Sequence, residues 1–159
     1  MKLPIAADVS AILRQGLAAA IFLGATGVQA QFAMVPPSAL QADPPASQAA
    51  DEREYRKDAA RHLYAAFPSR IYKGKLPPLM YAVMITDTEL DATGQVQKVT
   101  VVRPPAAATE VTPWVVSLIR RASPFPAPTR LGEKAVYREI WLVDRSGRFQ
   151  VDTLTEGQP

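Results

Sequence analysis

Three carboxylates stand close together in the segment DTELDATGQVQKVTVV, which begins at Asp87. Asp87, Glu89 and Asp91 would occupy the first, third and fifth positions of a calcium loop. Such a loop requires glycine at its sixth position and a bidentate glutamate at its twelfth. Ala92 and Lys98 stand there instead, so a calcium loop is excluded. A weak cation site on one strand face stays an alternative, and a solvated hairpin tip is the preferred interpretation.

Other catalytic and metal-binding chemistry finds little support in the composition. The chain has no cysteine, which excludes thiol catalysis, disulfides and thiolate metal sites. Its one histidine, His62, excludes a multi-histidine metal site within a single chain, and we expect it to be a packed helix residue. No nucleophile elbow, phosphate loop or dinucleotide fingerprint occurs. We therefore expect a protein that is not an enzyme, with no cofactor and no metal.

Charge and composition indicate a globular protein without a nucleic-acid partner. The 18 basic and 15 acidic residues give a formal net charge of +3 and are mixed along the chain. Phosphate binding needs lysines and arginines clustered on one face, and no such cluster stands out in the sequence. The length suits one domain of ordinary size.

The amino-terminal residues have the pattern of an export signal. Lys2 and Arg14 precede the apolar run GLAAAIFLGATGV, which is shorter than the roughly 20 residues that span a bilayer. Small residues favour cleavage between Ala30 and Gln31. We expect a signal peptide over residues 1–30, a Pro/Ala-rich linker over 31–50 and a folded domain over 51–159.

Two helices are predicted within this domain. Asp51 and Glu54 have the spacing of a capping box, so the first helix should run from there to about Ala66. In the second, Thr112 should be the N-cap and Pro113 the first helical residue. Apolar residues recur at helical spacing in both helices: Tyr55, Ala59, Leu63 and Ala66, then Trp114, Val115, Leu118, Ile119 and Ala122.

Two β-hairpins are predicted beside these helices. Strands over 80–90 and 95–103 flank the turn DATG, and strands over 135–143 and 148–154 flank its echo DRSG. In the first hairpin, Val99 and Val101 should share a face with Gln95 and Gln97. The fold class is therefore α+β: an antiparallel sheet of two hairpins packed on two helices, in the order helix, hairpin, helix, hairpin.

The order and spacing of these motifs resemble the TonB C-terminal domain family. The matching residues are FPSR at 67–70, the D-x-x-G-x-V hairpin of Asp91, Gly94 and Val96, and PFP at 124–126. The amino-terminal helix also resembles the related C-terminal domain of TolA. The resemblance covers about residues 53–154. It implies a noncatalytic periplasmic domain that binds a protein partner, such as a segment of an outer-membrane transporter, by adding it as a strand.

The resemblance places partner binding at a sheet edge, where unpaired backbone groups bond to an extended peptide. The corresponding edge is 135–143, unless the last strand covers it, in which case 148–154 would be the free edge. The residues that we expect there are Tyr137, Glu139, Trp141, Val143, Phe149 and Val151.

Several alternatives stay open at the level of sequence. If the signal is not cleaved, the chain would be an inner-membrane-anchored energy transducer of the TonB type, although its linker is short for that role. Pairing of the free edge between two copies would give a homodimer. A small hydrolase or cation-binding protein is the least supported alternative. The preferred interpretation is a periplasmic binding domain in a bacterium with two membranes.

Overall fold

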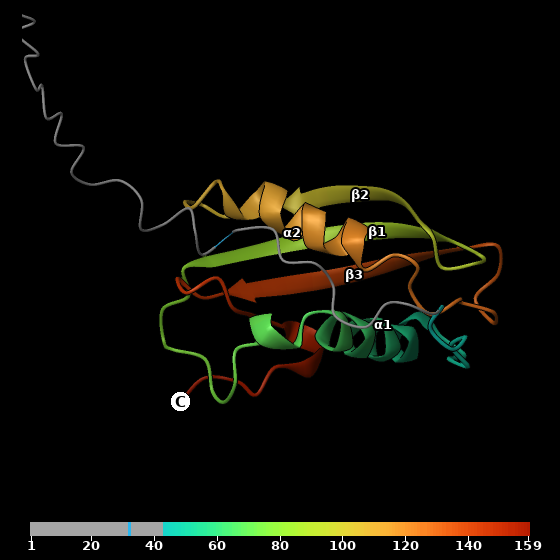
Figure 1. Ribbon diagram of the computed structural model, residues 1–159, viewed down its shortest axis with the longest axis horizontal. Helices are drawn as coiled ribbons and strands as arrows, with labels where there is room; N and C mark the ends of the chain where they lie inside the picture. Colours follow the sequence, from blue (N-terminus) through green and yellow to red (C-terminus); the bar gives the residue numbers. More distant parts are fainter. Residues whose placement is uncertain (1–31, 33–42) are drawn as a thin grey trace, which may run out of the picture.

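The computed structural model describes Phe32 and residues 43–159 of the chain (Figure 1). The predicted signal peptide and its cleavage site between Ala30 and Gln31 lie outside the described residues. The fold class is α+β, as predicted, with a four-stranded antiparallel sheet and two α-helices. The elements in chain order are α1 (Glu52–Ala66), the 3-10 turn η2 (Pro68–Arg70), β1 (Ala82–Asp91), β2 (Val96–Arg103), α2 (Val111–Arg121), β3 (Lys134–Val143), β4 (Phe149–Val151) and the 3-10 turn η3 (Asp152–Leu154).

Helix α1 begins with the predicted capping box. The Asp51 side chain accepts the backbone N–H of Glu54 at 2.8 Å, and the Glu54 carboxylate accepts that of Ala50 at 2.9 Å. These bonds satisfy two amide groups that have no partner within the helix. The predicted apolar stripe is fully buried: Tyr55, Ala59, Leu63 and Ala66. The helix ends before Phe67 and Pro68.

The sheet has the strand order β2-β1-β3-β4, so its central strands are β1 and β3. Both predicted hairpins are confirmed: β1 pairs with β2 and β3 pairs with β4, all antiparallel. Figure 1 shows α2 lying across β2 and β1, and α1 alongside β3. Each helix thus covers the part of the sheet nearest to it, on one face.

The two D-x-x-G turns have the same local hydrogen bonds, which explains the sequence echo. The Gly94 N–H donates to the Asp91 carbonyl at 3.0 Å, and the Gly147 N–H donates to the Asp144 carbonyl at 3.0 Å. Both glycines have positive φ, +84° and +71° respectively, which residues with a side chain rarely adopt. The turns are therefore hairpin tips in both places.

Gly94 also has a tertiary role that the turn alone does not require. A Cβ built on Gly94 would stand 1.9 Å from the Phe125 carbonyl oxygen, closer than any real contact. The Phe125 N–H donates to the Gly94 carbonyl at 2.8 Å. The PFPAP segment, which is neither helix nor strand, therefore packs directly on the first hairpin turn.

Alternation along the strands separates a core face from an open face. In β1, Met84, Thr86, Thr88 and Leu90 are buried beneath the helices, while the residues between them are partly exposed. The core face of β3 carries Ala135, Tyr137, Glu139, Trp141 and Val143, all of them buried. The opposite, open face has no helix over it among the described residues.

Two details of the prediction are wrong. The β1–β2 register shifts between Glu89 and Leu90, and such a bulge reverses the facing of the residues beyond it. Val96, not Gln97, therefore packs with Val99 against the core. Helix α2 begins at Val111 rather than after Thr112, with no side-chain cap. Pro113 is tolerated because the first turn needs no intrahelical N–H donor.

The packed part of the chain includes residues 43–50, which we predicted to be linker. The Ser47 N–H donates to the Ala127 carbonyl at 3.0 Å, and the Thr129 hydroxyl donates to the Ser47 carbonyl at 2.9 Å. Ser47 and Ala49 are buried. This segment forms no helix or strand, but it is hydrogen-bonded to Ala127 within PFPAP and to Thr129 just after it.

Candidate functional site

The three carboxylates of the first hairpin lie near one another, but each has its own partner. Asp87 accepts two hydrogen bonds from the Arg138 guanidinium, both at 2.7 Å. These hydrogen bonds, together with the positive charge of Arg138, lower the pKa of Asp87. Glu89 forms an ion pair with Lys98 at 3.3 Å. Asp91 accepts the N–H groups of Thr93 and Gln95 within the turn. Structural bonds thus account for all three side chains.

His62 is a packed helix residue, as expected. Its ring is buried, its Nε2 lies 2.6 Å from the Ala122 carbonyl oxygen, and it contacts the Phe125 ring at 5.1 Å between centroids. Burial lowers the pKa of His62, and the bond to Ala122 opposes this only in part. No group of acidic or histidine residues in the described part of the chain could hold a metal ion.

Both helices in the described residues are too short or too polar to span a membrane.

The side chains that we predicted to bind a partner all point into the core. Each is at most 1% exposed: Tyr137, Glu139, Trp141, Val143, Phe149 and Val151. Trp141 donates its indole N–H to the Thr86 hydroxyl at 3.0 Å and packs on Phe149. A partner at this edge would therefore meet the backbone of these residues and the side chains of their neighbours.

Strand β4 covers only the last part of the β3 edge. It is three residues long and pairs with Trp141–Val143, after which the chain turns into η3. The outer side of β4 is itself covered, because the Tyr72 N–H donates to the Phe149 carbonyl at 2.9 Å and Ile71 bridges Phe149 in parallel. The predicted strand over 148–154 is thus too long, and β4 is not a free edge.

Glu139 closes the point where β3 and β4 separate. Its carboxylate is fully buried and accepts the backbone N–H of Ile140 at 3.0 Å and that of Thr153 at 3.4 Å. It also accepts the Tyr137 hydroxyl at 2.8 Å and pairs with Arg56 of α1 at 3.2 Å. A buried carboxylate is stable only with such partners. Here it replaces the hydrogen bonds that a longer β4 would have made.

Burial and the Glu139 charge also act on the neighbouring tyrosine. Tyr137 is completely buried, and desolvation together with the carboxylate raises its pKa well above the ordinary value. The phenol therefore remains neutral and a hydrogen-bond donor at physiological pH. This network of Arg56, Glu139 and Tyr137 fixes the first half of β3 to α1.

The outer edge of β3 between residues 134 and 140 has no strand partner among the described residues. The Ile140 N–H turns to this outer side, where it meets Glu139. Alternate residues of a strand direct their backbone groups to the same side, so Val136 and Arg138 present theirs there as well. We call residues 134–140 the free β3 edge.

Strand β2 forms the other edge of the sheet, and it is less regular. Its pairing with β1 has two register shifts, whereas the pairing of β1 with β3 runs without one from Ala82 to Asp91. Bulges and positive charges such as Lys98 and Arg103 are the devices by which edge strands avoid pairing. The free β3 edge is thus the better template for an added strand.

Apolar side chains on the open face lie beside the free β3 edge. Val83 pairs with Leu142 across β1 and β3, and Ile85 pairs with Ile140. Val136 follows toward the start of β3 and is 46% exposed. We call these residues the open-face stripe. Sequence alternation indicated apolar groups on both faces of β3, but not which face the helices would cover.

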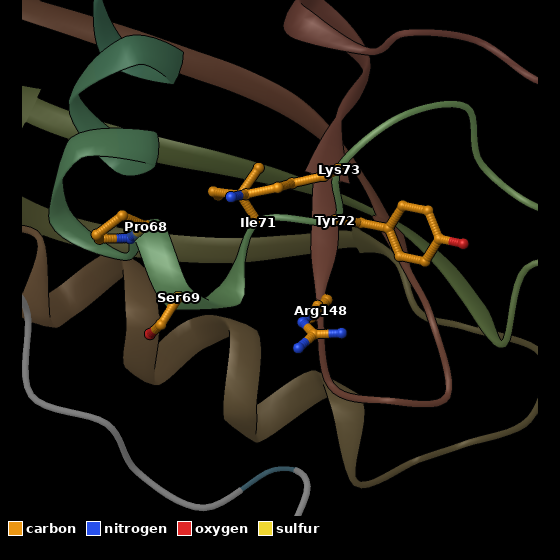
Figure 2. A pocket seen from close by; sticks show the side chains of 6 residues that line it. All are labelled: Pro68, Ser69, Ile71, Tyr72, Lys73 and Arg148. Carbon is orange, nitrogen blue, oxygen red and sulfur yellow. The ribbon is translucent and has the colours of Figure 1, made fainter.

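A second candidate site lies toward the other end of β3, where the chain after α1 passes β4. It is a cavity of about 560 Å³ lined by Pro68, Ser69, Ile71, Tyr72, Lys73 and Arg148 (Figure 2). Sequence reasoning missed it because its residues come from segments far apart in the chain. The only sequence signal was the positive charge of SRIYKGK, which does not point to Arg148.

No family model, no curated protein and no solved structure matches this chain. The resemblance to the TonB C-terminal domain therefore rests on the residues quoted above alone.

Proposed function

We propose that this protein is a noncatalytic, exported binding domain of the TonB C-terminal type, which holds an extended segment of a protein partner on the free β3 edge. The observation that carries this proposal is a regular central strand whose outer backbone groups have no strand partner from residue 134 to 140 in the described chain. Such groups form a ladder with an incoming strand at little steric cost.

The surroundings of the edge support the same function. The open-face stripe gives alternate side chains of the added strand an apolar surface, and Val136 is its most exposed member. The Asp87–Arg138 pair joins β1 to β3 on the same face, between Ile140 and Val136 of the stripe. The carboxylates of the first hairpin are engaged in ion pairs and turns, so a binding role is better supported than hydrolysis or cation binding.

Site-specific photo-crosslinking in cells tests the edge, and the chain offers a matched control position. Val136 on β3 and Val102 on β2 are each 46% exposed but lie at opposite edges of the sheet. A crosslinker at position 136 should capture a partner that one at position 102 does not. Capture of the protein's own chain alone would show edge-paired homodimers and overturn the proposed partner.

Proline substitution then tests whether the backbone is what binds. Val136→Pro removes an N–H that faces outward from β3, a position where proline is tolerated. Binding of the captured partner should weaken at least about tenfold, because one ladder hydrogen bond is lost and the strand approach is disturbed. Val102→Pro on β2 should leave it unchanged. Equal effects of the two prolines, in variants that unfold normally in urea, would contradict the assignment.

A further inference from the structure

The cavity beside β4 is built by two segments, residues 68–73 and Arg148 just before β4, which the fold holds together. Arg70 donates from Nη1 to the Gly147 carbonyl at 3.3 Å, which ties the segment after α1 to the second hairpin turn. The Gln150 side chain donates to the carbonyls of Tyr72 and Gly74 at 2.9 and 2.8 Å. Gln150 is itself buried. The walls of the cavity are therefore set by the fold.

The cavity is positively charged and has no acid in its lining. Lys73 and Arg148 both line it, and neither forms an ion pair among the described residues, although Asp144 attracts Arg148 from farther away. Arg70 lies close enough to add its charge: burial first, and then repulsion from Arg148, lowers the pKa of Arg70. Lys73 and Arg148, which form no ion pair among the described residues, would be stabilised by a bound anion.

The remaining lining indicates what kind of anion fits. Figure 2 shows Pro68 and Ser69 on one side of the cavity and Arg148 on the other, with Ile71 and Lys73 above them. Ser69 adds a hydroxyl donor, while Pro68 and Ile71 add apolar surface; the Tyr72 ring points away from the other labelled side chains (Figure 2). A volume of about 560 Å³ lies within the range of small-molecule sites, and it exceeds what a bare inorganic ion fills.

We propose that this cavity binds a phosphate ester with an apolar body, the phosphate between Arg148 and Lys73 and the body against Ile71 and Pro68. An arginine fork and a lysine point charge are the usual pair for phosphate oxygens. The ester could be a phospholipid head group or a soluble phosphomonoester, which share this chemistry. The site is separate from the free β3 edge, so it stands or fails independently of strand addition.

Titration of the full chain with phenyl phosphate at low ionic strength, with NMR or calorimetry as the readout, tests the site. We expect saturable binding with one site per chain. Lys73→Gln and Arg148→Gln should each weaken it at least about tenfold, because a charge-assisted hydrogen bond is lost. Lys75→Gln is the matched control: this lysine is exposed, lies two positions from Lys73 and does not line the cavity. It should change the affinity less than twofold.

Several results would overturn the proposal. These are an absence of saturable binding at millimolar phenyl phosphate, an equal loss in Lys75→Gln, or binding of phenylacetate as tight as that of phenyl phosphate, which would indicate a site for peptide carboxylates. Vesicles distinguish the two sources of phosphate. Sedimentation with phosphatidylglycerol but not phosphatidylcholine vesicles, lost in Arg148→Gln, assigns a lipid head group. Phenyl phosphate binding without vesicle binding assigns a soluble ester.

Discussion

Replacing Gly94, a buried turn residue, by alanine should be among the most destabilising single changes in this fold. Gly94 has φ of +84°, a conformation that costs alanine roughly 1–2 kcal/mol. The added Cβ would stand 1.9 Å from the Phe125 carbonyl oxygen, which is backbone and cannot turn away. The PFPAP segment must therefore move from the turn.

The magnitude follows from what that movement disturbs. The hydrogen bond from the Phe125 N–H to the Gly94 carbonyl, 2.8 Å long, is worth about 1 kcal/mol. Phe125 is fully buried, so displacing it adds a repacking cost of about 1–3 kcal/mol. We expect Gly94→Ala to lower the free energy of unfolding by about 3–6 kcal/mol in total, a large part of the ~5–15 kcal/mol typical of a domain.

Urea unfolding of Gly94→Ala and a matched control measures this. Gly74 has nearly the same φ, +81°, but nothing lies within 4 Å of the position of its Cβ. Gly74→Ala should therefore lower the free energy of unfolding only by the backbone strain, about 1–2 kcal/mol. The difference between the two variants isolates the contact with Phe125. If the free energies of unfolding of the two variants fall by the same amount within about 1 kcal/mol, the contact between PFPAP and the turn contributes little to stability.

Three further changes test other parts of the structure by urea unfolding. Glu139→Ala should lower the free energy of unfolding by about 3 kcal/mol, because it leaves the buried Tyr137 hydroxyl and Ile140 N–H without an acceptor. A decrease below about 1 kcal/mol would contradict the role of Glu139 between β3 and β4. Asp51→Ala should lower the free energy of unfolding by about 1 kcal/mol, because the N-cap hydrogen bond is lost. Asp51→Asn should lower it much less, because asparagine can also act as an N-cap. Burial lowers the pKa of His62 below its ordinary value of 6.5, so the unfolded state binds more protons than the folded state. The free energy of unfolding should therefore fall as pH drops from about 7.5 toward 5.5. The variant His62→Gln should abolish this pH dependence.

Features set by local chemistry could be predicted from the sequence. The Asp51–Glu54 capping box fixes the start of α1, and the two D-x-x-G turns fix both hairpins, because their hydrogen bonds lie within a few residues. The apolar spacing of α2 identified its buried face for the same reason. Its exact start was missed because Val111 enters the helix without a side-chain cap to mark it.

Features set by contacts between distant segments could not be predicted. A charged residue such as Glu139 is expected on the solvent side of a strand. In the structure it lies in the core, where it pairs with Arg56 and accepts hydrogen bonds from Tyr137 and Thr153. The Pro-rich segment near Ser47 reads as linker, yet Ala127 supplies a backbone partner. The cavity around Arg148 needs two segments far apart in the sequence, 68–73 and 148, to meet. No local pattern in the sequence encodes such meetings.

The position of Glu139 limits any strand that the proposed function would add. Its carboxylate already accepts the Ile140 N–H, and β4 occupies the edge beyond it. An added strand can therefore pair from Lys134 to about Arg138 and must then turn away or displace η3. Affinity for a short segment would depend strongly on side chains that reach the open-face stripe. A partner segment should thus carry large apolar residues at alternate positions, and replacing Val136 with serine should weaken its binding more than replacing Val102 with serine.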